Sequence, residues 1–366
     1  MAEKSGASAE ERQLLRHSVR GFLSARWPVE HAVERAGDAA AVKNLWRDLA
    51  AQGLCALGSD PLEAGLGEIL LVFDELGRAS CPAPLLGAVI ANLALRQRQT
   101  PAAAALLEGL HKGANAVAVA LGAFDGDAAA GRVDFANGAL TGKISFAEGA
   151  AAASHFLVMV EDPAGLAIVA AGAPGLSLVA TPGLAIPALS ELGFSPAHAD
   201  FVALPASELA ELAQVARLAC ASRAYGAAQR AFDLAIEHAK LRRQFGQLIG
   251  QFQAIQHKLV NCLISLDGAR LTLDSAAASY DRGDPSWRIF AAAALAYAGP
   301  ALRQVVLEAH HTLGAIGYAE EHEVPRHFRR VHADLARFGG APRARAELAD
   351  YLLGSPEASH VHASRA

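Results

Sequence analysis

Residues 241–256 read LRRQFGQLIGQFQAIQ and separate two stretches with helical periodicity. Before them, Phe232, Ala235, Ile236 and Ala239 recur at positions that share one face of a helix. Gly246 is a suitable end for that helix, because glycine adopts left-handed conformations without steric strain. Apolar periodicity resumes near residue 251 and extends to about 282. The segment therefore predicts a turn between two long helices.

Helical patterns continue on both sides of this region. Towards the C-terminus they predict helices at about 285–309, 325–338 and 342–353, followed by a polar tail. In the N-terminal region, Ser8 and Glu11 form a potential capping box before the first helix. A second helix contains Leu45 and Leu49, and others cover about 67–79, 85–95 and 102–110. Both ends of the chain are therefore predicted to be helical.

The middle of the chain has a different pattern. Short apolar runs lie at 116–121, 155–160, 166–170 and 176–179, and turn-forming pairs such as Asn137-Gly138 and Pro174-Gly175 separate them. Such spacing is typical of a small antiparallel sheet or barrel. We therefore expect an α+β chain of three domains: helices at 1–114, a β domain at 115–205, and a helical bundle with a polar tail at 206–366.

Composition excludes several classes of protein. Of the 366 residues, 52% are hydrophobic and 19% charged, which indicates a large buried core. The formal net charge of −5 disfavours a nucleic-acid-binding protein. We expect no membrane span, because no apolar run reaches about 18 residues. The N-terminal residues lack the apolar core of a signal peptide, so we expect a cytoplasmic location.

The cysteines and histidines do not predict a metal site. Cys55, Cys81, Cys220 and Cys262 form no Cys-x-x-Cys pair, so we expect reduced, buried thiols. None of the closest histidine pairs has a carboxylate at the spacing of a metal site.

Several motifs resemble those of one family. Residues 241–256 resemble the Arg-x-x-Phe-Gly…Phe-Gln-x-x-Gln stretch of the acyl-CoA dehydrogenases. Residues 311–318, HTLGAIGY, resemble the family's Gln-x-x-Gly-Gly-x-Gly-Phe loop, and 325–330, PRHFRR, resemble the helix that follows it. Weaker matches lie at 66–78 and 138–143. The resemblance spans about residues 10–353 and implies an acyl-CoA dehydrogenase-like fold: an N-terminal helical domain, a small middle β-barrel domain and a C-terminal helical bundle.

The resemblance also implies a chemistry. The family oxidises acyl-CoA thioesters between Cα and Cβ, with a carboxylate base and an FAD that two subunits share, and an electron-transfer flavoprotein as partner. By resemblance, Arg242 reaches the pyrophosphate of a neighbour's FAD, which suits the paired donors of a guanidinium. Phe245, expected on the same helix face, packs on the adenine side. Gln253 and the loop residues His311, Gly314 and Ala315 complete this AMP half, although His311 and Ala315 replace the usual Gln and Gly.

The flavin-ring half departs from the family pattern. Residues 120–127, ALGAFDGD, stand where the family has its Thr-Glu-Pro…Gly-Ser-Asp loop, and Ser145-Phe146-Ala147 stand for its Trp-x-Thr pattern. We expect Phe124 and Phe146 to fill the resulting cleft, because an empty one would lose packing contacts.

The catalytic base is missing from both positions that the family uses. Gly339 stands for the Glu of the Tyr-Glu-Gly run, and Ala216 occupies the alternative position beside Arg217, the family's substrate-side arginine. Asp334, Glu347 and Asp350 are the nearby carboxylates that remain as substitutes. The resemblance therefore implies no catalytic residue in this chain and a substrate-binding role for Arg217.

Three hypotheses follow. The preferred one is a non-catalytic subunit that pairs with a paralogous catalytic acyl-CoA dehydrogenase in a bacterial heterotetramer, such as those acting on steroid side-chain thioesters. In that assembly the acyl-CoA substrate binds through the partner, and FAD is shared across the subunit interface. The first alternative is a self-sufficient homo-oligomeric dehydrogenase with a displaced base. The second is a scaffold protein that binds no nucleotide.

Overall fold

The computed structural model describes residues 8–60, 64–98, 100–183 and 185–354. Its N-terminal part is helical, as predicted, and the capping box of Ser8 and Glu11 begins the first helix. Leu54 lies outside the second predicted helix, in a short 3-10 turn. The helices are α1 (Ala9–Arg26), α2 (Val29–Glu34), α3 (Ala39–Ala51), α4 (Leu66–Arg78), α5 (Leu85–Leu95) and α6 (Pro101–His111).

The middle part is a β domain, as predicted. One sheet has the strand order β1-β4-β5-β8 and the other β2-β3-β7-β6, with β1 and β4 parallel and every other pair in these two sheets antiparallel. The two sheets enclose one apolar core. The strands are β1 (Val117–Ala120), β2 (Gly131–Ala136), β3 (Ala139–Glu148), β4 (His155–Val160), β5 (Gly165–Ala170), β6 (Leu176–Ala180), β7 (Leu189–His198) and β8 (Asp200–Ala203).

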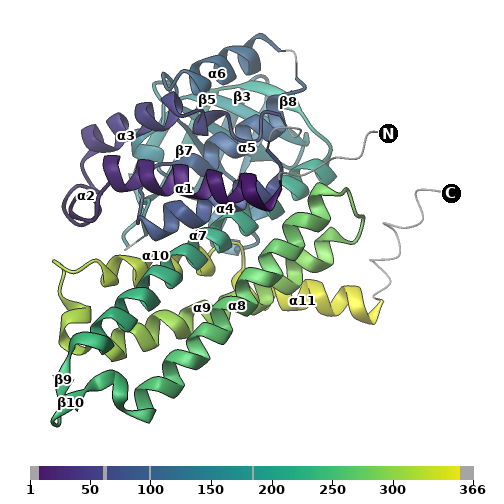
Figure 1. Cartoon of the computed structure of the whole chain (residues 1–366). Helices are drawn as coiled ribbons and strands as arrows, with labels where there is room; N and C mark the ends of the chain where they lie inside the picture. Colours follow the sequence, from purple (N-terminus) through teal and green to yellow (C-terminus); the bar gives the residue numbers. More distant parts are fainter. Residues whose placement is uncertain (1–7, 61–63, 99, 184, 355–366) are drawn as a thin grey trace.

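The C-terminal part is a helical bundle that lies beneath the other two parts in the view of Figure 1. Its longest member, α7, has 36 residues and crosses from the bundle to the N-terminal helices. A short hairpin of β9 (Arg243–Gln244) and β10 (Gln247–Leu248) joins α7 to α8. The helices are α7 (Ala206–Leu241), α8 (Gln253–Asp281), α9 (Trp287–Leu313), α10 (Val324–Ala336) and α11 (Gly340–Leu353).

The prediction that α7 extends to Gly246 is wrong. The helix ends at Leu241, and Phe245 and Gly246 form the hairpin turn with φ angles of 50° and 81°. Two consecutive positive φ angles are typical of the tight turns that join antiparallel strands. Gly246 therefore serves the turn and not the helix end.

One helical segment, Trp287–Tyr318, is long and apolar enough to cross a membrane by length and composition alone. Half of its most apolar window is buried inside the protein. Burial of this kind is typical of a core helix, and it accounts for the apolar composition of α9.

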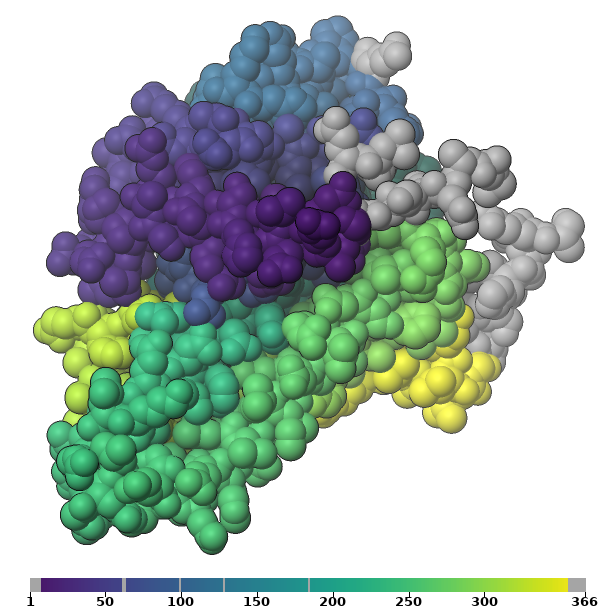
Figure 2. All heavy atoms as spheres, in the orientation of Figure 1, coloured from purple at the N-terminus to yellow at the C-terminus, as the bar shows by residue number. Residues whose placement is uncertain are grey.

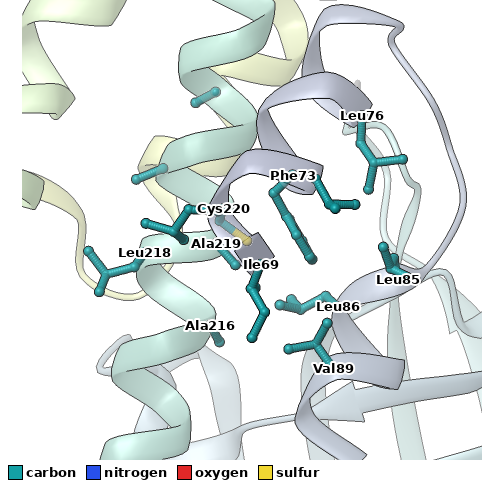
Figure 3. Close-up of a cluster of buried hydrophobic side chains, with 14 of the residues drawn as sticks. Ile69, Phe73, Leu76, Leu85, Leu86, Val89, Ala216, Leu218, Ala219 and Cys220 are labelled. Atoms are coloured by element: carbon teal, nitrogen blue, oxygen red, sulfur yellow. The ribbon is translucent and has the colours of Figure 1, made fainter. Parts of the chain in front are cut away.

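The main core lies where α4, α5 and α7 meet. Figure 3 shows Ile69 and Phe73 of α4 and Leu86 of α5 directed towards the Ala216–Cys220 stretch of α7. Glycines bring α4 and α7 close together: a Cβ on Gly77 would overlap the carbonyl oxygen of Arg223, and one on Gly226 would overlap that of Asp74. Alanine is therefore excluded at both positions, although the surrounding helix is rich in it.

We predict that Gly226→Ala lowers the free energy of unfolding by about 1–3 kcal/mol, because the added methyl group forces two packed helices apart. The matched control is Gly21→Ala in exposed α1, where a Cβ meets no atom within 4 Å. The control is expected to be neutral or stabilising by up to about 1 kcal/mol, since alanine favours helix. Urea denaturation measures both, and equal effects would contradict the close contact.

Candidate functional site

The residues expected to contact the AMP half of FAD lie on an exposed end of the bundle. Arg242 follows the last residue of α7 with extended backbone, and its side chain is exposed. Phe245 is 92% exposed at the tip of the hairpin, where its ring edge contacts Phe252 at a centroid distance of 6.2 Å. The two residues do not share a helix face, which corrects that expectation. Both project away from the chain.

The second motif lies at the same end. Gln253 begins α8 and His311 lies in the last turn of α9. These two helix ends are side by side, because Lys258 Nζ lies 3.0 Å from Glu308 Oε2 and His311 Nδ1 lies 3.3 Å from the same oxygen.

Gly314 and Ala315 follow α9 in the short 3-10 helix η6 (Gly314–Tyr318), and both are exposed, as are Gln253 and His311. In the view of Figures 1 and 2 the hairpin and the adjoining helix ends protrude from the body of the molecule. This surface therefore presents a cation, an aromatic ring and exposed loop amides to a molecule outside the chain.

The region expected to hold the flavin ring is closed by direct contacts between domains. The turn η2 (Gly122–Asp125) follows β1, and its Asp125 Oδ1 accepts a hydrogen bond of 3.1 Å from the amide of Phe338. Arg343 donates to the carbonyl oxygens of Phe124 at 3.4 Å and Asp125 at 3.0 Å. Arg337 donates to the carbonyl oxygen of Phe146 at 3.3 Å. Arginines of the C-terminal bundle, together with partly buried Phe124, occupy this junction.

A buried charge network lies directly behind these contacts. Glu148, at the end of β3, accepts two hydrogen bonds of 2.7 Å from Arg223 and one of 2.7 Å from Arg337. Asp334 of α10 accepts from Arg223 at 2.9 and 2.7 Å. Arg223 also lies over the ring of Phe73 in α4, 5.9 Å from its centroid. One side chain of α7 thus connects all three parts of the fold.

The network fixes the ionisation of Glu148. Burial by itself raises the pKa of this carboxyl group, but the charges and hydrogen bonds of Arg223 and the charge of Arg337 outweigh burial and lower the pKa to about 2. Glu148 is therefore ionised at neutral pH and is too weak a base to remove a carbon-bound proton efficiently.

Glu148, Cys220 and Asp334 also place three potential metal-ligand atoms within 4.8 Å of one another. The arginines that bond both carboxylates already supply the positive charge that a cation would bring. Burial raises the pKa of the Cys220 thiol to about 12, so this group stays protonated and is a poor ligand. We therefore interpret the three residues as part of the ion-pair network.

The positions that the family uses for the catalytic base carry no acidic group. Gly339 has a φ of 72°, and a Cβ there would lie 2.8 Å from Cβ of Arg343. Ala216 is fully buried in the main core. Asp334 is bonded to Arg223, and Asp350 lies exposed on α11.

Glu347 is held by arginines on two sides. Its oxygens accept from Arg217 Nη1 at 2.8 Å and from Arg343 Nε at 2.8 Å. Arg217 also bonds Gln214 at 2.6 Å, so the predicted substrate arginine is engaged within the chain. The pocket beside it holds only about 290 Å³ of empty space, below the range of about 300–1,000 Å³ typical of sites for drug-sized ligands.

The sequence analysis missed Glu148, Arg223 and Arg337. A signal for Arg223 was present, since it is a charged residue within an otherwise small and apolar stretch of α7. Its partners lie 75 and 111 positions away, so their pairing becomes visible only in the structure.

Comparison with known proteins agrees with this architecture. The model of the acyl-CoA dehydrogenase C-terminal domain matches residues 209–341. The chain is 30% identical over 332 residues to acyl-CoA dehydrogenase IpdE2 of Mycobacterium tuberculosis, covering 88% of this chain and 91% of that protein. The chain belongs to the acyl-CoA dehydrogenase family.

Solved structures of the family superpose on nearly the whole chain. A chain of the Tcur3481-Tcur3483 steroid ACAD G363A variant has a TM-score of 0.82 and 27% identity, covering 94% of this chain and 98% of that one. A chain of the ChsE4-ChsE5 complex from Mycobacterium tuberculosis has a TM-score of 0.77 at 23% identity, covering 96% and 99%. The second likeness concerns the fold alone.

We predict that Glu148→Gln lowers the free energy of unfolding at pH 7 by about 3–5 kcal/mol, because it leaves buried arginine charge uncompensated. The folded-state pKa of Glu148 is lowered to about 2 from an ordinary value of 4.5. The stabilisation is therefore complete above pH 4.5 and is lost as the pH falls towards 2. Urea denaturation at pH 7 and pH 3 should show a smaller difference from wild type at pH 3.

The control is Glu191→Gln, which breaks the exposed pair with Lys143. Exposed pairs contribute about 0–1 kcal/mol, so little change is expected at either pH. Equal destabilisation by the two variants would contradict the role assigned to the buried network.

Proposed function

We propose that this chain is the non-catalytic subunit of a heteromeric, flavin-dependent acyl-CoA dehydrogenase, and that it contributes the AMP and pyrophosphate half of an FAD shared with a catalytic partner. The observation that carries the proposal is the closed junction between the β domain and the bundle. Arg337, Phe338 and Arg343 bond directly to the segments that would otherwise hold the flavin ring.

The residues at this junction do not fit an isoalloxazine ring. The polar groups of residues 124, 125 and 146 that face the bundle are already bonded to it. Gly339 supplies no base, and the nearby carboxylates Asp334 and Glu347 are held in ion pairs. We therefore assign no proton-transfer step to this chain.

The exposed end of the bundle fits a contact with a cofactor held by another subunit. Arg242 has an exposed guanidinium group, which suits paired hydrogen bonds to phosphate oxygens. Phe245 is almost fully exposed, and an aromatic ring in that position suits stacking on a planar base. Gln253, His311, Gly314 and Ala315 border them and would complete the contact. When bound, FAD supplies the redox chemistry, which no side chain supplies.

Two solved relatives favour a heteromeric assembly. Each is described by a pair of components, Tcur3481 with Tcur3483 and ChsE4 with ChsE5, and the first is called a steroid ACAD. We extend this arrangement to the present chain: its partner is a paralogue with an intact base, which binds the acyl-CoA. We further propose a cytoplasmic location, a role in lipid or steroid catabolism, and an electron-transfer flavoprotein as electron acceptor.

The first test is the flavin content of the chain alone and of its complex with a complete paralogue. The chain alone is expected to be flavin-free and inactive, and the complex to hold FAD and oxidise acyl-CoA. A yellow, active homo-oligomer of this chain would instead favour the self-sufficient dehydrogenase. In the complex, Arg242→Ala is expected to weaken FAD binding about ten- to a hundredfold, since a charge-assisted hydrogen bond contributes about 1.5–3 kcal/mol.

The matched control is Arg243→Ala, which removes the adjacent exposed arginine of β9. It is expected to leave flavin occupancy after dilution unchanged. If both variants retain wild-type flavin occupancy and turnover, Arg242 is a surface cation and the scaffold hypothesis is favoured.

A second prediction concerns the missing base. Gly339→Glu is expected to give the isolated chain no dehydrogenase activity, because residue 339 has left-handed backbone and Arg343 fills the adjacent space. The variant should also be less stable, since a side chain at this backbone conformation is strained. Acyl-CoA oxidation above background by the isolated Gly339→Glu chain would show that only the base is missing and would contradict the proposal.

A further inference from the structure

The small pocket beside Arg217 has a cationic wall. It lies between α7, α9 and the connection from α10 to α11, and its charged lining residues are Arg217, Arg337 and Asp334. Both oxygens of Asp334 accept hydrogen bonds from Arg223, so this carboxylate is already neutralised. Leu295, Leu335 and Phe338 form an apolar part of the wall.

Two guanidinium nitrogens of the wall have no hydrogen-bond partner among the described residues. They are Nη2 of Arg217 and Nε of Arg337, and the two residues are only 4% and 9% exposed. A buried N–H group without a partner is unfavourable, and native structures satisfy most such groups. The pocket therefore offers donors that the rest of the chain does not satisfy.

The N-terminus of α11 faces the same pocket. Gly340 and Ala341, the first two residues of this 14-residue helix, belong to the lining. The N-cap residue is Gly339, and within the described part of the chain no side chain caps this helix. Amides at a helix N-terminus carry partial positive charge and attract anions.

The surrounding charges do not balance. The arginines of this junction are Arg217, Arg223, Arg330, Arg337 and Arg343, and the carboxylates are Asp125, Glu148, Asp334 and Glu347. Five positive and four negative side chains leave an excess of one positive charge. A single anion in the pocket would neutralise this excess and satisfy the two guanidinium nitrogens together.

We infer that this pocket binds a small monocarboxylate with a short apolar tail, such as butyrate. The carboxylate would accept hydrogen bonds from Arg217 and Arg337, and the tail would contact the leucines and Phe338. The single charge matches the excess, and the apolar wall favours a carboxylate over phosphate. This inference does not depend on FAD sharing, since it concerns a free acid and not a thioester.

Isothermal titration calorimetry of the full-length chain, or of its complex with the partner if the chain is obtained only in that form, tests the inference. Butyrate is titrated at constant ionic strength, with sodium chloride, phosphate and the neutral isostere butyramide as comparisons. Butyrate is expected to bind with one site per chain, and the other three to show no saturable binding. Saturable binding of butyramide, or binding of phosphate in place of butyrate, would overturn the inference.

Two variants locate the site. Arg217→Gln is expected to weaken butyrate binding at least tenfold, because it removes a charged donor from the pocket. Ala221→Leu, which fills the pocket from α7, is expected to abolish binding. The matched control is Arg343→Gln: it removes the other arginine bonded to Glu347, but Arg343 does not line the pocket, so affinity should change less than about threefold.

Wild-type affinity in both pocket variants would place the carboxylate elsewhere and overturn the inference. Circular dichroism of each variant establishes that it is folded. If one pocket variant does not fold, the other variant and the comparison of butyrate with butyramide still decide the question. Since no flavin is needed, the result is independent of the outcome for Arg242.

Discussion

The pairing of Arg223 with Glu148 and Asp334 is the interaction on which the arrangement of the three parts depends. The guanidinium group lies on α7 and its partners lie on β3 and α10, while its face is covered by Phe73 of α4. Desolvating these charges is unfavourable, and only good geometry on both sides compensates for it. The relative placement of the domains is therefore held to within hydrogen-bond distance.

This constraint also accounts for the closed junction. Arg337 bonds the same carboxylate, Glu148, and continues to the carbonyl oxygen of Phe146, while Phe338 and Arg343 bond the turn after β1. A planar cofactor between these segments would separate charges that are buried away from water. The fold of a flavin enzyme is thus retained around an interior of ion pairs.

The far end of the bundle has the opposite character. There the best-preserved family motif forms a hairpin whose arginine and phenylalanine are exposed. Isolated exposed aromatic rings are common on proteins, but an aromatic and a cation at the tip of a tight turn are held in fixed positions. The chain is therefore rigid where it meets itself and offers ordered side chains where a partner would bind.

The sequence by itself determined the order of elements. Apolar periodicity located nearly all the long helices, and turn residues located several of the short strands, because both signals are local. The family motifs likewise predicted the missing base at Gly339 and the candidate contact at Arg242. These conclusions required only residue identity and spacing.

Tertiary structure decided what those residues contact. The sequence placed Phe245 on a helix, but the turn formed with Gly246 placed it at the tip of a hairpin. The sequence also gave no indication that Glu148 and Asp334 meet at Arg223, since a charge carries no record of a partner many positions away. Pairing of buried charges depends on how helices and sheets pack, and that packing arises from the apolar contacts of the whole chain.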